Sequence, residues 1–175
     1  GSIGQLAIAD YIESLGVRVE HNYRFSGRKE VDIFLPDHNL AIEYHGVWFH
    51  SAKFKSPSFH KEKLDACSAS GIRLVQIFSD EWQNKEAVVK QVLANMLGVT
   101  KRKGCARSYS VEYISHQEAR EVYNTHHMLG APVAGGDNIA LRDRDGRVAS
   151  LMTITRPMGT RGSVREGSSK ELVRF

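Results

Sequence analysis

Residues 30–50 read EVDIFLPDHNLAIEYHGVWFH, and two apolar runs in this stretch decide the fold. The runs Val31–Leu35 and Leu40–Tyr44 predict two β-strands, and the intervening PDHN predicts the tight turn of a hairpin. Each strand is interrupted by one acid, Asp32 in the first and Glu43 in the second. A charge in a core strand is costly unless it is paired or binds a metal ion. Because the strands are neighbours, we expect the two carboxylates to converge on one point.

Two convergent carboxylates are hard oxygen ligands, which suit Mg²⁺ or Mn²⁺. Such an ion activates a water and neutralises the charge that builds up on a scissile phosphate. The structural alternative is that a lone Asp in a strand more often lies at a turn edge or in a salt bridge. The order of an Asp, a turn and a Glu-x-basic element, here ending in His45, favours the metal site.

Hydrophobic periodicity predicts further elements on both sides of the hairpin. They are a helix over 4–15, a strand over 17–23, a helix over 60–70, a strand over 72–78 and a helix over 81–97. Asp80 is the predicted N-cap of the last helix, and residues 46–59 are predicted to be irregular. The order is α-β-β-β-α-β-α. Since a strand that follows a crossover helix can join the sheet in parallel, we expect an α/β fold with a mixed β-sheet flanked by helices.

The second part of the chain predicts a smaller α+β unit. A basic segment, VTKRKGCAR at 99–107, separates a first domain at 3–98 from a second at 108–175. In the second domain we expect a strand over 108–114, a helix over 116–126, a hairpin of 138–142 and 147–155, and a last strand over 171–175.

Charge is distributed unevenly along the chain, whose net charge is +4. Residues 1–98 carry 11 Lys/Arg and 12 Asp/Glu, hence −1, and residues 99–175 carry 13 and 8, hence +5. This suits a catalytic unit joined to a unit that grips a polyanion, although a solvated basic surface is an equally good explanation. No apolar run is long enough to span a membrane. The two cysteines, Cys67 and Cys105, lack metal-ligand spacing, so we expect a reducing, intracellular compartment.

The segment from Asp32 to Glu43-Tyr44-His45 resembles the PD-(D/E)xK nuclease signature, with His45 where that superfamily usually has Lys. The segment His45–His50 also resembles the aromatic, His-rich segment of very-short-patch repair endonucleases. Residues 71–82 (GIRLVQIFSDEW) are similar to a segment of phage-borne homing endonucleases of the EDxHD group. The resemblance covers about residues 3–98. It implies a restriction-endonuclease-like fold and Mg²⁺-dependent cleavage of double-stranded DNA in the cytoplasm of a phage host.

The resemblance also implies roles for single residues. Asp32 and Glu43 are the expected metal ligands, and His50 matches the family's general base. His45 is expected to contact a phosphate in place of the usual Lys. His60 and Lys63 lie three apart on one helix, where relatives place polar residues near the site, and Lys63 is expected to stabilise the phosphate. The alternatives are core packing for His50 and an exposed helix face for His60 and Lys63.

One position departs from the resemblance. Homing relatives carry a Gly-Glu pair in the first helix, whereas this chain has Gly4-Gln5. We retain Gln5 as a candidate site residue, and the change is either natural to this branch or a disarming substitution. The preceding Gly1-Ser2 resembles a remnant of an expression tag and is left out of the fold prediction.

Several residues are candidates for contacts with DNA. Trp48 and Phe49 are expected either to wedge between base pairs or to pack under the loop. Phosphate contacts are expected from Lys53, Lys55, Lys101, Arg102, Lys103 and Arg107.

Residues 108–175 resemble the region that follows the nuclease domain in such phage proteins. The matching features are Asn124–His127, the run 148–153 and the run ELVRF at 171–175. This region resembles an acetyltransferase-type fold, cut short here, but Gly130–Gly136 is a poor phosphate-binding loop. We expect it to position DNA.

Three functions stay open at this point: a site-specific homing-type endonuclease, a mismatch-directed nicking enzyme of repair, and a DNA-binding module on a decayed nuclease. The sequence leaves the target site and a homodimer open as well.

Overall fold

The structure, a computed structural model, describes residues 1–27, 29–46, 57–100, 104–133, 135–155 and 171–174, the last four and residues 57–60 by their backbone alone. The chain divides into two compact units, Gly1–Lys101 and Arg102–Phe175. The division falls inside the segment that the sequence predicts as a linker. Each unit is described by itself.

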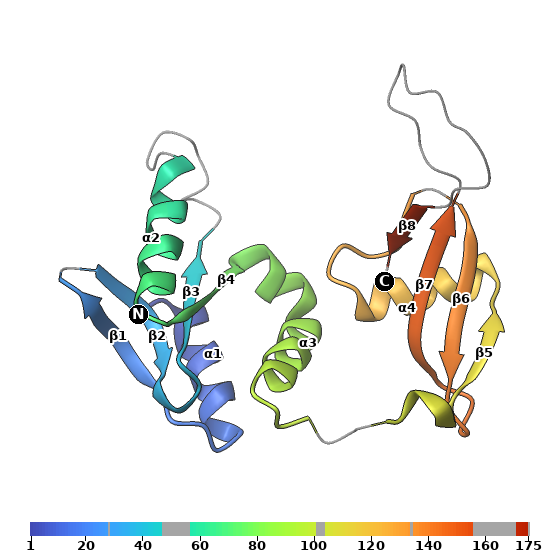
Figure 1. Cartoon of the computed structure of the whole chain (residues 1–175), viewed down its shortest axis with the longest axis horizontal. Helices are drawn as coiled ribbons and strands as arrows, with labels where there is room; N and C mark the ends of the chain where they lie inside the picture. Colours follow the sequence, from blue (N-terminus) through green and yellow to red (C-terminus); the bar gives the residue numbers. More distant parts are fainter. Residues whose placement is uncertain (28, 47–56, 101–103, 134, 156–170, 175) are drawn as a thin grey trace. The chain divides into compact units, whose positions relative to one another are not determined.

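The first unit holds one four-stranded sheet and three α-helices (Figure 1). Its elements are α1 (Ile3–Ser14), β1 (Glu20–Ser26), β2 (Lys29–Leu35), the 3₁₀ turn η1 (Pro36–His38), β3 (Leu40–His45), α2 (Pro57–Ala69), β4 (Arg73–Phe78) and α3 (Ser79–Met96). The sheet order is β1-β2-β3-β4, with β1, β2 and β3 antiparallel in turn and β4 parallel to β3. The predicted mixed sheet and element order are therefore confirmed.

Helices lie on both faces of this sheet at β3. Gly4 of α1 lies so close to Tyr44 that a Cβ atom on it would stand 2.2 Å from the Tyr44 Cζ atom. Lys63 of α2 instead reaches Glu43, the preceding residue of the strand. Because successive strand residues point to opposite faces, α1 and α2 cover opposite faces here.

The core on the α2 side is formed by Val31, Phe34, Ala41, Cys67 and Ile72, all buried. Tyr23 stacks on Phe34 with ring centroids 4.1 Å apart. Cys67 is fully buried, and burial raises the pKa of its thiol. Together these contacts fix α2 against the sheet.

Some predicted boundaries in the first unit are wrong. The first strand begins at Glu20 and not at Val17, because its pairing with β2 begins at Glu20↔Phe34 and β2 ends one residue later. Helix α2 begins at Pro57, inside the segment predicted to be irregular, since proline is well suited to a helix start.

Two helix starts also differ from the prediction. The helix predicted to be capped by Asp80 begins at Ser79, and the Phe78 N–H donates to Glu81 Oε2 at 3.0 Å. Asp80 lies in its first turn, where a negative charge is favourable. Ser2, left out of the prediction, is the N-cap of α1.

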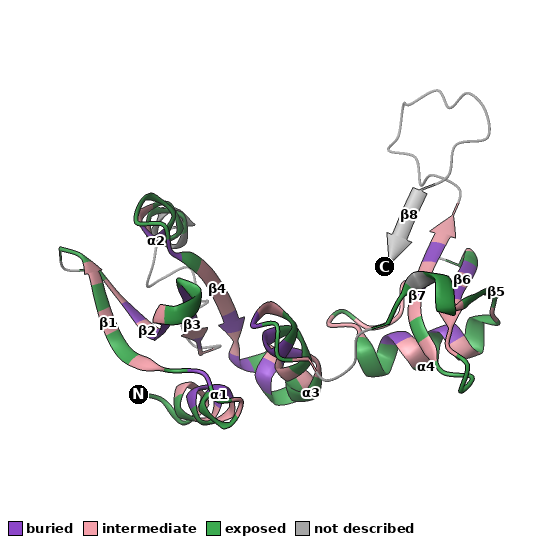
Figure 2. Cartoon of the chain, turned by 60° about the horizontal axis from the view of Figure 1, so that its bottom comes forward, coloured by how far each residue is buried: buried purple, intermediate pink, exposed green. Residues whose placement is uncertain are grey.

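The second unit is a four-stranded antiparallel sheet with one long helix against it (Figure 1). Its elements are η3 (Ala106–Ser108), β5 (Ser110–Tyr113), α4 (His116–His126), β6 (Asp137–Arg142), β7 (Val148–Thr155) and β8 (Glu171–Arg174), in the sheet order β5-β6-β7-β8. Ala119 and Tyr123 of α4 pack on Ala140 and Leu151 of the sheet. The two buried residues of α4 are therefore one helical turn apart, on the face that lies against the sheet (Figure 2).

Candidate active site

The two acids that interrupt the hairpin meet where its backbone ladder ends. Residues of β2 and β3 pair from Leu35↔Leu40 to Ile33↔Ile42. At the next position, the Asp32 N–H donates to Glu43 Oε1 at 3.3 Å and the Tyr44 N–H donates to Asp32 Oδ2 at 2.9 Å. The side-chain carboxylates thus accept amide protons that a regular ladder would pair with carbonyl oxygens. We call Asp32, Glu43 and the two amides that they bind the carboxylate fork.

Glu43 is 6% exposed, so its carboxylate is largely removed from water. Burial raises the pKa of its carboxyl above 4.5, and the Asp32 charge raises it further. The hydrogen bond from Lys63 opposes this effect, and so do the Lys63 charge and the Asp32 N–H. The net effect is that Glu43 ionises less readily than an exposed Glu, while the Lys63 ammonium stabilises its carboxylate form.

Lys63 supplies that ammonium from helix α2. Its Nζ atom lies 2.5 Å from Glu43 Oε1, and its side chain is 19% exposed. Cys67 lies one helical turn further on, on the same face of α2, and packs into the core. The burial of Cys67 therefore directs Lys63 toward the carboxylate fork.

His45 lies two residues after Glu43 and so on the same face of β3. It is 8% exposed, and its ring lies 5.3 Å from the ring of Phe78, at an interplanar angle of 34°. The pairing of β3 with β4 sets His45 directly beside Phe78. His45 is thus packed beside Phe78 of β4, while Lys63 reaches Glu43 from α2.

Gln5 contributes to the start of α1. Its Oε1 accepts the Ser2 N–H at 2.5 Å, and its own N–H donates to Ser2 Oγ at 3.3 Å, which completes a capping box. The neighbouring Gly4 packs on Tyr44, so the N-terminal turn of α1 lies against the strand that carries Glu43.

The structure does not place the remaining predicted residues relative to the fork. Arg107 is exposed in η3 of the second unit. Outside the described side chains lie Trp48, Phe49, His50, Lys53, Lys55, His60, Lys101, Arg102 and Lys103. Within the described residues, no group of three or more His, Cys, Asp or Glu side chains is placed to hold a metal ion.

Sequence reasoning missed the direct pairing of Lys63 with Glu43 and the contact of Gly4 with Tyr44. Both depend on how helices cross the sheet, which the spacing of one segment does not contain. The only signal was the helical position of Lys63 one turn before a buried cysteine.

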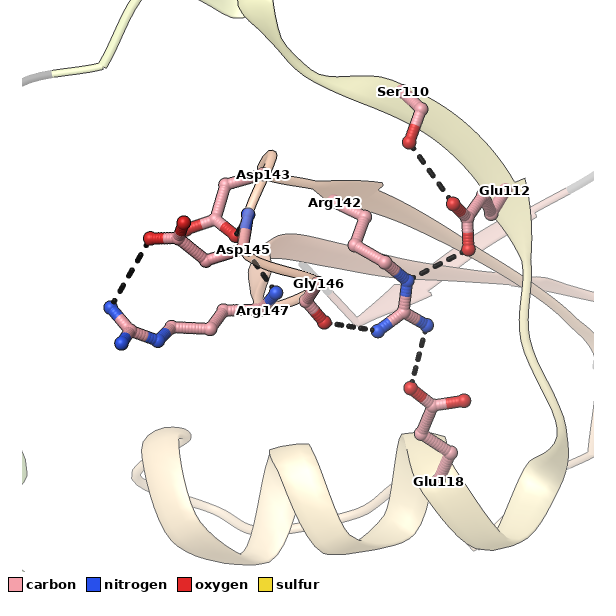
Figure 3. A network of polar contacts seen from close by, with 8 residues as sticks. All are labelled: Ser110, Glu112, Glu118, Arg142, Asp143, Asp145, Gly146 and Arg147. Carbon is pink, nitrogen blue, oxygen red and sulfur yellow. Dashed lines mark hydrogen bonds and ion pairs between the residues drawn. The ribbon is translucent and has the colours of Figure 1, made fainter.

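The second unit has its own polar network, around Arg142 (Figure 3). The guanidinium donates to Glu112 Oε2, Glu118 Oε1 and the Gly146 carbonyl, each at 2.7 Å. These bonds tie the β6–β7 turn to β5 and α4. A hollow of about 870 Å³ lies beside the network. Each of the three guanidinium nitrogens donates one of these bonds, so Arg142 holds the turn, the strand and the helix together.

No family model matches the sequence, and neither does any curated protein. Among solved structures, the chain is similar to the catalytic domain of the homing endonuclease I-Bth0305I. The two share 23% sequence identity, the likeness covers 56% of this chain and 96% of that domain, and the TM-score is 0.47. A likeness of this degree does not show which reaction this chain catalyses.

No helix in the described ranges combines the length and the apolar character that crossing a membrane requires.

Proposed function

We propose that this chain is a metal-dependent DNA endonuclease that hydrolyses phosphodiester bonds at the carboxylate fork. The observation that carries the proposal is the convergence of Asp32 and Glu43 on adjacent strands, with the Lys63 ammonium 2.5 Å from Glu43. Two acids and a lysine in one half-buried cluster are costly to maintain for stability alone. They match the composition of a site for phosphoryl chemistry.

Asp32 and Glu43 fit a hard divalent cation such as Mg²⁺ or Mn²⁺, because both offer carboxylate oxygens on one side of the hairpin. Such an ion, when bound, activates a water and neutralises charge that develops on the scissile phosphate. The oxygens are not all free in this structure, since each acid also accepts an amide proton. The fork is thereby pre-organised, because its carboxylates are already oriented by the backbone.

Lys63 has two proposed roles at the fork. It supports the ionised form of Glu43, whose pKa burial would otherwise raise further. It also brings a positive charge to a site that must accept an anionic phosphodiester. We infer that Lys63 replaces the lysine that the PD-(D/E)xK signature places on the strand, where this chain has His45.

We also propose a substrate and a general base for the reaction. Double-stranded DNA is the proposed substrate. It is bound mainly by residues 99–175, whose own net charge is +5. His50 is proposed as the base that takes a proton from water, and Trp48 and Phe49 as contacts to the duplex. A site-specific homing-type reaction is preferred over mismatch-directed nicking because the resemblance to homing enzymes covers both halves.

Plasmid cleavage tests the proposal. The chain is incubated with supercoiled DNA and Mg²⁺, Mn²⁺ or EDTA, and with the variants Asp32→Ala and Asp32→Asn. We expect cleavage only with the divalent ion, and a loss of at least about a hundredfold in both variants. Asp32→Asn is the informative control because its amide oxygen can still accept the Tyr44 N–H, so the melting temperature should be nearly that of the wild type.

Three other outcomes would change the assignment. Cleavage that persists in Asp32→Asn would remove the fork from the chemistry. Metal-independent DNA binding without any cleavage would favour the non-catalytic module, and a strong preference for T:G-mismatched over matched duplexes would favour the repair enzyme.

A further inference from the structure

A second, smaller hollow lies on the side of α4 in the second unit. Its volume is about 150 Å³. The helix contributes His116, Ala119, Arg120 and Tyr123, which share one face at helical spacing. The other walls come from Asn138 of β6 and from Ala131, Pro132, Val133 and Gly135. We call this the α4 hollow.

A buried chain of hydrogen bonds ends at His116 in the α4 hollow. The Tyr123 hydroxyl lies 3.0 Å from Thr153 Oγ1, and Thr153 Oγ1 donates to Asn138 Oδ1 at 2.7 Å. Asn138 Nδ2 lies 3.0 Å from His116 Nδ1. Since the single hydroxyl proton of Thr153 goes to Asn138, Tyr123 must be the donor to Thr153. The chain thus runs in one direction, from Tyr123 to His116.

This direction fixes the tautomer of His116. In the orientation that the structure gives the Asn138 amide, its nitrogen faces His116 and only donates, so Nδ1 of the imidazole accepts. The ring proton is then at Nε2, on the other side of the ring. Asn138, Thr153 and Tyr123 are 5%, 1% and 3% exposed, so this orientation is held by groups that water cannot readily replace.

The α4 hollow presents donors without matching acids. Arg120 forms no ion pair with the residues that the structure describes, and no Asp or Glu lines the hollow. Two acids of α4 are engaged elsewhere, since Glu118 accepts from Arg142 and Glu121 from Gln117. A guanidinium and an oriented imidazole N–H therefore remain available to an acceptor.

We propose that the α4 hollow binds a phosphate group. Arg120 supplies charge and several N–H donors, His116 supplies one N–H donor of fixed direction, and both suit the oxygens of a tetrahedral anion. The volume is about half of the roughly 300 Å³ at which pockets for whole small molecules begin, so it suits a phosphate group and not a nucleotide. The phosphate comes either from a nucleic-acid backbone or from free phosphate. The inference does not depend on the carboxylate fork, which belongs to the first unit.

Three variants test the proposal from different sides. Arg120→Ala removes the charge. His116→Asn keeps an acceptor for Asn138 near the position of Nδ1 but lacks the Nε2 donor. Gly135→Leu fills the hollow without changing charge, because a Cβ at Gly135 would lie 3.8 Å from His116 Cε1 and the backbone there is not left-handed. Arg144→Ala is the matched control, since it removes one exposed arginine of the same unit that does not line the hollow.

The measurements use the full chain in EDTA, so that cleavage does not intervene. Inorganic phosphate is titrated while NMR follows the imidazole nitrogens of His116 and, in His116→Asn, which lacks them, the guanidinium Nε of Arg120. Duplex DNA binding is followed by anisotropy at several salt concentrations. We expect phosphate to shift the Nε2 signal, and the three hollow variants to weaken phosphate binding about tenfold or more. Arg144→Ala should bind phosphate as the wild type does. Circular dichroism checks that each variant is folded, and only folded variants are compared with the wild type.

The DNA arm identifies the source of the phosphate. If the backbone of DNA is the ligand, Arg120→Ala lowers the salt slope of DNA binding by about one and Gly135→Leu weakens binding without a charge change. If free phosphate is the ligand, the hollow variants lose phosphate binding but bind DNA no more weakly than Arg144→Ala. The proposal is overturned if phosphate leaves the His116 signal unmoved and the folded hollow variants bind DNA like Arg144→Ala.

Discussion

At the residue scale, the carboxylate fork combines a structural and a chemical requirement in the same atoms. Asp32 and Glu43 complete the hydrogen bonding of two backbone amides where the ladder between β2 and β3 ends. Their second requirement is charge, which burial opposes and Lys63 supports. Glu43 is therefore the residue at which stability and chemistry conflict most directly.

This conflict predicts a dependence of stability on pH. The pKa of Glu43 is raised above 4.5 in the folded state, so its protonated form favours folding. The stability that it contributes is full below pH 4.5 and is lost as the pH rises through the folded pKa. In urea unfolding with EDTA present, the free energy of unfolding of the wild type should therefore fall relative to Glu43→Gln as the pH rises from 4.5 toward neutrality.

Glu112 supplies a control of opposite sign. Hydrogen bonds from Arg142 and then Ser110 lower the pKa of its carboxyl. Its contribution is present above pH 4.5 and is lost as the pH falls through the folded pKa. Glu112→Gln should thus differ from the wild type most near neutrality, and least in acid. Parallel pH profiles for the two variants would contradict at least one of the two assignments.

How far single residues can be predicted depends on what places them. Asp32 and Glu43 were visible in the sequence because each interrupts an apolar strand, where a charge is costly unless it is paired or binds a metal ion, and because the two strands are joined by a tight turn. The contact between Lys63 and Glu43 was not, because it depends on how α2 crosses the sheet. The capping role of Gln5 was missed for a different reason, since Ser2 had been left out of the prediction.

At the element scale, local patterns predicted the order of helices and strands, and tertiary pairing decided their ends. The hairpin turn is a case where local chemistry was sufficient, since Asn39 adopts the left-handed conformation (φ 46°) that asparagine tolerates. The first strand is the opposite case. Val17 alternates with its neighbours as strand residues do, yet β2 ends at Leu35, one residue beyond the partner of Glu20, and so offers no partner to Val17.

The contact of α1 with β3 gives a prediction about Gly4. Replacing a helical glycine by alanine usually stabilises a helix, by roughly 0.5–1 kcal/mol. Here the added Cβ would overlap the Tyr44 ring, so Gly4→Ala should instead destabilise the chain by about 1–3 kcal/mol. Urea unfolding measures the change. In a Tyr44→Ala background the same substitution should regain the ordinary helix stabilisation, and a stabilising Gly4→Ala in the wild type would show that α1 does not pack this closely.

At the scale of the whole molecule, the chain consists of two units with separate cores. Val31, Phe34, Ala41, Cys67 and Ile72 form a core on the α2 side of the first unit. The core of the second forms between α4 and its sheet. The two units also differ in secondary structure, since one has a mixed sheet and the other an antiparallel sheet.

Separate cores predict separate unfolding. Calorimetry of the full chain should show two transitions, and a fragment of residues 1–101 should unfold cooperatively within about 3 °C of one of them. The fragment should also retain Asp32-dependent cleavage but need lower salt, because the more basic half is absent. A fragment that lacks a cooperative transition would show that the first unit needs the second in order to fold.

The carboxylate fork has a consequence for how its occupancy can be observed. The amide protons of Asp32 and Tyr44 are protected only while the opposing carboxylates accept them. A ligand that draws either carboxylate away must release the amide that it held, even if the strands themselves do not move. Hydrogen–deuterium exchange at these two positions would therefore register binding directly, whether or not cleavage follows.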